Sequence, residues 1–266
     1  MNKLATVFVA VALFVVASTA RAVTYTGTQT DTVKKEGTVA FKASATFVVS
    51  NLDLVVTLSN TGTYDPRSSA DILTGVFFDL VGDAHLTPVS ATVPMPGDSV
   101  IGHALPSGFD GNVGGEWAYA NGLAYTTSEG TDNEGISSTK LKWFKKKALF
   151  PGEKIPGVSP LSGVQFGVTT LEDTAGNDLG SLKNKGLIQD TVVFVFDLPS
   201  SLSGLTTSTI SNDISNVTFQ YGTSIKTGID IAGEMVAQVP EPNTISLVAV
   251  GLLGAAALAK SRARRR

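Results

Sequence analysis

Residues 41–58 alternate between apolar and polar side chains with a period of two. In FKASATFVV (Phe41–Val49) the odd-numbered residues are apolar, and Lys42, Ser44 and Thr46 lie between them. After Ser50-Asn51 the alternation resumes, with apolar residues at every second position from Leu52 to Leu58. This period is that of a β-strand with one face on a core, and the polar pair favours a hairpin. The segment therefore predicts two antiparallel strands, with Leu52 on the apolar face of the second.

The rest of the central region has the same character. Further strands are predicted at GVFFDLV (75–81), LIQDTVVFVFDL (187–198), VTFQY (217–221) and IDIAGEMVAQV (229–239). Clusters of Gly, Pro, Asn, Asp and Ser separate them, and no long stretch holds a helical period of 3.6 residues. We therefore predict an all-β protein whose body is a single sandwich or jelly-roll-like domain.

The first residues have the composition of a secretory signal peptide. Lys3 supplies a positive charge, Leu4–Ala17 is apolar, and Ala20 and Ala22 form an A-x-A site. This order predicts export through the Sec machinery and cleavage after Ala22. An uncleaved anchor is the alternative, but it would need about twenty apolar residues. The sequence contains no cysteine, so the body uses neither disulfides nor thiolate chemistry.

The body between the two terminal segments is acidic. The chain has 20 Lys and Arg against 23 Asp and Glu; seven of the basic residues but only Glu241 among the acids lie in the terminal segments. The body therefore has a net charge of about −9. An acidic surface does not follow a phosphate backbone, so nucleic acid is not an expected partner.

The sequence contains no recognisable catalytic constellation. His85 and His103 are isolated, and no HExxH, paired-histidine metal spacing or G-x-S-x-G occurs. Carboxylates are numerous enough for a glycosidase pair, although a sequence does not give their separation. TDNEG (131–135) and LEDTAGND (171–178) are predicted loops with oxygen ligands that suit calcium, but they lack the D-x-[DN]-x-[DN]-G spacing. We therefore predict a protein that is not an enzyme and has no cofactor and no metal site.

LKWFKKK (141–147) is an unusual local cluster, with Trp143 and Phe144 among four lysines. It has two interpretations: contact with an anionic polysaccharide, or a strand edge that lysines protect while one aromatic ring faces the core. NVT at Asn216 is a formal glycosylation sequon beside a predicted strand.

The C-terminal segment combines three features in a fixed order. Val239-Pro240-Glu241-Pro242 comes first, Ile245–Ala259 is apolar, and the basic residues that follow are Lys260, Arg262, Arg264, Arg265 and Arg266. Pro240 and Pro242 prevent helix just before the apolar run and leave an extended peptide that a protease could bind. About fifteen apolar residues with a basic end predict a marginal membrane segment whose end stays in the cytoplasm. A permanent single-span anchor is the alternative.

This order resembles the PEP-CTERM sorting signal that exosortases of Gram-negative bacteria process. The matching residues are Pro240, Glu241 and Pro242, then GLLGAAALA from Gly251, then the basic end. The resemblance implies transient anchoring in the inner membrane, cleavage by an exosortase at or near the tripeptide, and release to the cell surface or the extracellular space. The expected division of the chain is a signal peptide at 1–22, a β-sandwich surface domain at 23–238 and a sorting signal with a hydrophobic helix at 239–266.

The body is also similar to one group of exosortase-dependent surface proteins. The stretches that carry the similarity are residues 59–80, 114–125, 134–144, 160–170, 185–199 and 214–224. KWFKKK departs from the Gly-rich segment expected at that place, so no shared ligand is implied there. The resemblance implies a surface or matrix protein and brings no catalytic residues with it.

Two function classes follow. The first is a non-catalytic surface or extracellular-matrix component that exosortase sorts and that associates with extracellular polysaccharide in a biofilm. The second is a secreted carbohydrate-active enzyme, or a carbohydrate-binding module, on the same β-sandwich. A groove with two facing acids and aromatic platforms would favour the enzyme, whereas a smooth sandwich would favour the first class.

Overall fold

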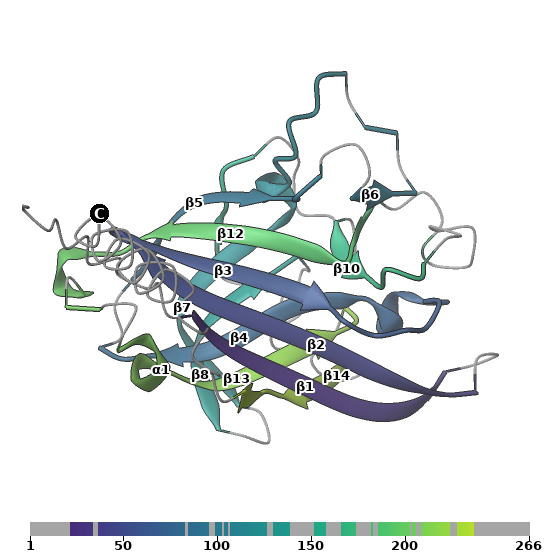
Figure 1. Ribbon diagram of the computed structural model, residues 1–266, viewed down its shortest axis with the longest axis horizontal. Helices are drawn as coiled ribbons and strands as arrows, with labels where there is room; N and C mark the ends of the chain where they lie inside the picture. Colours follow the sequence, from purple (N-terminus) through teal and green to yellow (C-terminus); the bar gives the residue numbers. More distant parts are fainter. Residues whose placement is uncertain are drawn as a thin grey trace, which may run out of the picture.

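The computed structural model describes the body of the chain and not its two ends. The described residues are 22–33, 37–82, 85–95, 99–102, 104–105, 107–126, 130–138, 152–157, 166–173, 182, 186–202, 204–205, 209–223 and 228–236. Within them the chain forms two β-sheets that pack face to face, which confirms the predicted all-β sandwich (Figure 1).

The first sheet has six strands in the order β15-β1-β2-β3-β12-β5. Every neighbouring pair in it is antiparallel. Its strands are β1 (Ala22–Val33), β2 (Gly37–Ser50), β3 (Asp53–Asn60), β5 (Thr87–Thr92), β12 (Thr191–Asp197) and β15 (Glu234–Val236).

The second sheet is centred on β4, which pairs with β8, β10 and β13. Its strands are β4 (Leu73–Leu80), β6 (Val100–Ile101), β7 (Ala118–Thr126), β8 (Thr131–Ser137), β9 (Glu153–Lys154), β10 (Gly167–Thr169), β11 (Leu187–Gln189), β13 (Ile214–Tyr221) and β14 (Ile229–Ala232). The helical elements are short connections: η1 (Ser69–Asp71), η2 (Gly114–Glu116), η4 (Ser200–Leu202) and α1 (Ile210–Asp213).

Aromatic side chains from both sheets meet in the core between them. Phe47 on β2 makes edge-to-face contacts with Tyr25 and with Phe78 of the opposite sheet, at ring distances of 6.1 and 5.1 Å. Trp117 packs in the same way on Phe194. Such contacts add to the hydrophobic burial that holds the two sheets together.

The predicted hairpin at residues 41–58 is confirmed, with its turn shifted by one residue. β2 ends at Ser50, β3 begins at Asp53, and the loop is Asn51-Leu52. Asn51 has φ +58°, a left-handed conformation that Asn tolerates better than most residues. The turn removes Leu52 from the strand and leaves it 68% exposed, so its predicted place on the apolar face was wrong.

Two segments predicted as single strands are each divided between the sheets. Residues 187–198 form β11 in the second sheet and β12 in the first, with the break at Asp190, where φ is +71°. Residues 229–236 form β14 and β15, and the break falls at Gly233. At both places the chain bends and crosses from the second sheet to the first. The alternation of apolar and polar residues does not predict this crossing, because it shows the face of each residue and not the sheet to which a strand belongs. The predicted continuation to residue 239 lies outside the described residues.

TDNEG was predicted as a loop and is part of β8 instead. Asp132 and Glu134 are both fully buried there, and β8 pairs with β4 on one side and β7 on the other. Gly135 permits this packing, because a Cβ at that position would lie 2.7 Å from Leu123 and 2.8 Å from Phe77. Pairing on both sides therefore outweighs the turn-like composition of the segment.

Candidate functional site

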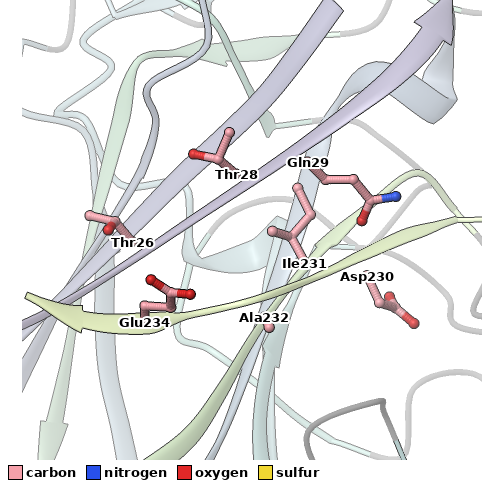
Figure 2. Close-up of a pocket in the computed structure, with 7 residues that line it drawn as sticks. All are labelled: Thr26, Thr28, Gln29, Asp230, Ile231, Ala232 and Glu234. Carbon is pink, nitrogen blue, oxygen red and sulfur yellow. The ribbon is translucent and has the colours of Figure 1, made fainter.

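A polar groove lies where β1 of the first sheet meets β14 and β15. It has a volume of about 370 Å³ and is lined by Thr26, Thr28, Gln29, Asp230, Ile231, Ala232 and Glu234 (Figure 2). Gly27 lets these strands approach, because a Cβ there would lie 2.7 Å from the carbonyl oxygen of Ala232. The groove therefore depends on a glycine in β1 and on the crossing of the chain at Gly233.

Asp230 is the carboxylate at one end of the groove. Its Oδ2 accepts a 2.8 Å hydrogen bond from the hydroxyl of Tyr125, and its Oδ1 is buried with no hydrogen-bond partner among the described residues. Burial raises the pKa of Asp230 above its ordinary value of 3.8, and the Tyr125 hydrogen bond opposes the rise. Burial and the charges of Asp230 and Asp132 raise the pKa of Tyr125 in turn. Asp230 is therefore an aspartate whose charged form the fold disfavours.

Gln220 lies directly opposite Asp230 across the β13–β14 pair. Phe219 and Tyr221, on either side of Gln220, belong to the main core, so Gln220 points to the outer face of the sheet. Paired residues of antiparallel strands point to the same face, so Asp230 lies on the outer face as well. Gln220 is fully buried, and neither atom of its amide has a hydrogen-bond partner in the described part of the chain. Asp230 in the groove and Gln220 beside it thus form a row of polar side chains along the outer face of the second sheet.

The groove presents hydroxyl, amide and carboxylate groups that can exchange hydrogen bonds with a polar ligand. Figure 2 shows the carboxylate of Glu234 directed towards Thr26 and that of Asp230 directed away from β1, so the two acids do not face one another. Among the described residues, no group of three or more His, Cys, Asp or Glu is placed to hold a metal ion. The two acids of the groove are therefore not arranged as the facing carboxylate pair that glycosidase chemistry uses.

Asp230→Asn is expected to gain stability relative to the wild type as pH rises. A folded-state pKa above the unfolded value means that the folded protein binds the proton more tightly, so wild-type stability falls as pH rises through the folded pKa. Asparagine has no charge to bury and can still accept the Tyr125 hydrogen bond. Urea unfolding of both proteins at pH 3.5 and pH 7 checks this; an identical stability difference at the two pH values would contradict it.

A second buried carboxylate, Glu134, belongs to a structural network in the main core. The Tyr119 hydroxyl donates a hydrogen bond to Oε2 of Glu134. The side-chain amide of Asn121 donates a second one to Oε1 of Glu134, with an N–O distance of 2.6 Å. The Tyr119 hydroxyl also accepts the backbone N–H of Leu86 at 3.1 Å. His85 is exposed and lies 3.8 Å from Glu153, while His103 lies outside the described residues.

The residues predicted to direct sorting fall almost entirely outside the described part of the chain. This holds for Ala20, Pro240, Glu241, Pro242, Lys260 and Arg262–Arg266, and also for LKWFKKK. Ala22, the predicted last residue of the signal peptide, is the first residue of β1 and pairs with Val48. No helix within the described ranges is long and apolar enough to cross a membrane. The sequence did not indicate Asp230, Tyr125 or Gln220, because each looks like an ordinary strand residue.

Both ends of the described chain lie on the same edge of the first sheet. β15 pairs with β1 so that Thr24 lies opposite Val236, and Ala22 is only two residues before Thr24. A family model for the PEP-CTERM protein-sorting motif matches residues 238–266, which begin two residues after β15 ends. Comparison with curated proteins and with solved structures gave no match. The chain therefore carries at its C-terminal end the PEP-CTERM sorting motif of exosortase substrates, which supports an exported, membrane-processed surface protein.

Proposed function

We propose that the protein is a non-catalytic component of the cell surface or extracellular matrix that associates with extracellular polysaccharide after exosortase has removed its tail. The observation that carries this proposal is the sorting motif that begins directly after the last strand of a β-sandwich. The exosortase, the Sec machinery and, transiently, the inner membrane are its expected partners.

The groove supports a binding role over an enzymatic one. Its two carboxylates diverge, and no aromatic ring is among the residues that line it. Thr26, Thr28 and Gln29 are exposed along β1 and can hydrogen-bond with sugar hydroxyls. A carbohydrate-binding module is the second candidate, favoured by this polar groove, and a glycan array separates it from a passive matrix protein.

The mass of the mature protein and the fraction that contains it test the proposal. We expect the surface fraction to hold a chain that begins at Val23, ends near Pro240–Pro242 and lacks Arg266. This chain should co-sediment with extracellular polysaccharide and become soluble when the polysaccharide is digested. Surface protein that still carries Arg266 would contradict processing, and protein that sediments equally after digestion would contradict the association with polysaccharide.

A further inference from the structure

Four large apolar side chains are strongly exposed at one end of the sandwich. The exposed fractions are 68% for Leu52, 56% for Val81, 51% for Met235 and 44% for Val236. Single exposed apolar residues are normal, but a group of them marks an interaction surface. We call these four residues the apolar tip.

The register of the first sheet places three members of the tip at the same end of that sheet. Ser50 pairs with Asp53, so Leu52 is in the turn at the end of the β2–β3 hairpin. Val48 of the same hairpin pairs with Ala22, at the start of β1. Thr24 of β1 pairs with Val236, so Met235 and Val236 belong to this end as well.

Val81, which directly follows β4 of the second sheet, is at the same end. Its N–H donates to the carbonyl of Asp213 at 3.0 Å, and the next residue, Ile214, accepts a 2.6 Å hydrogen bond from the Tyr25 hydroxyl of β1. In Figure 1 this end is on the left, where β2 and β4 end, β12 ends and α1 lies. The tip thus spans both sheets.

The apolar tip is also the end to which both terminal segments attach. β1 starts there at Ala22, and the matched sorting motif starts two residues after Val236. Eight residues, 237–244, separate Val236 from the apolar run that begins at Ile245. At about 3.3 Å per residue this linker keeps this end of the sandwich within roughly 30 Å of the lipid.

We propose that the apolar tip contacts the lipid surface of the inner membrane while the tail is inserted, and leaves it when the tail is cut off; this rests on the tail anchoring that the proposed function includes. The acidic residues Asp53, Asp197 and Glu234 flank the tip and oppose autonomous binding to anionic lipids. The tether supplies the high local concentration that such a small apolar surface needs. Cleavage removes the tether, so the acidic body is released.

The absence of cysteine allows a direct test with single-cysteine variants of the full-length precursor. Leu52→Cys, Val81→Cys and Met235→Cys report on the tip. Met95→Cys and Leu171→Cys are matched controls, because these exposed residues follow β5 and β10 at the opposite end of the sandwich. Ala256→Cys reports on the tail. Each protein, labelled with an environment-sensitive fluorophore, is placed in phosphatidylethanolamine–phosphatidylglycerol vesicles that contain brominated lipid as quencher.

We expect the tip labels to be blue-shifted and quenched at least about twofold more than the control labels. Cleavage at a protease site inserted after Val239 should abolish that difference. Equal quenching at both ends, with the tail label quenched, would overturn the inference and leave anchoring intact. An unquenched tail label would overturn anchoring and the inference together, and tip quenching that survives cleavage would overturn the need for a tether.

Discussion

Glu241→Ala is expected to leave the full-length protein in the inner membrane and to lower its amount in the surface fraction by more than about tenfold. The reason is that Glu241 supplies the only charge of the tripeptide, between two prolines, which lack a backbone N–H and disfavour helix. Removing a carboxylate from a peptide that a protease binds leaves its partner groups unpaired. Immunoblots of inner-membrane and surface fractions, with the mass of each band, measure the effect.

Asn243→Ala is the matched control, since it lies just outside the tripeptide and before the apolar run. It should be processed like the wild type. Both variants should begin at Val23, because signal-peptide cleavage takes place at the other end of the chain. Release of Glu241→Ala with the mature mass would show that processing does not require this carboxylate.

The features that the sequence predicted are those determined by neighbouring residues. The alternation at residues 41–58 is local, and the strands follow it, because each apolar side chain can be buried only if its face packs on a core. The sorting motif is likewise a linear signal, with tripeptide, apolar run and basic end in a fixed order. Neither inference requires knowledge of how distant segments meet.

The features that the sequence did not predict depend on distant contacts. Tyr125 and Asp230 are separated by 105 residues and meet only because β14 pairs with β13 in the second sheet before the chain crosses to the first sheet at Gly233. The alternation around Asp190 shows which face each residue takes but not the sheet to which the strand belongs. The composition of TDNEG is that of a loop with oxygen ligands, whereas Asp132 is buried in β8 opposite Tyr125 of β7, a strand that the local sequence does not identify as its partner.

The position of the groove connects the fold with sorting. Glu234 lines the groove and also begins β15, the last strand before the matched motif. Cleavage near Pro240 would leave β15 attached to the body, so the released protein keeps every residue that lines the groove. The proposed binding of polysaccharide and the proposed anchoring by the tail therefore use adjacent but separate parts of the chain.

Phe47→Ala is expected to destabilise the processed protein by about 3–5 kcal/mol. Phe47 is fully buried and contacts Tyr25 in its own sheet and Phe78 in the opposite one, so its removal opens a cavity between the sheets. The chain has no cysteine and hence no disulfide to hold the sheets together, and domains of this kind are typically stable by only about 5–15 kcal/mol. Loss of this one ring therefore removes a large share of the free energy of unfolding.

Ser44→Ala is the control, because Ser44 lies on the same strand and faces away from the core. Its effect should stay within about 0.5 kcal/mol. Urea unfolding followed by far-ultraviolet circular dichroism gives both values, and the slope of the free energy against urea should be unchanged if only the native state is affected. A loss below about 1 kcal/mol for Phe47→Ala would contradict the sandwich packing described above, since no ring that bridges two sheets can be removed at so small a cost.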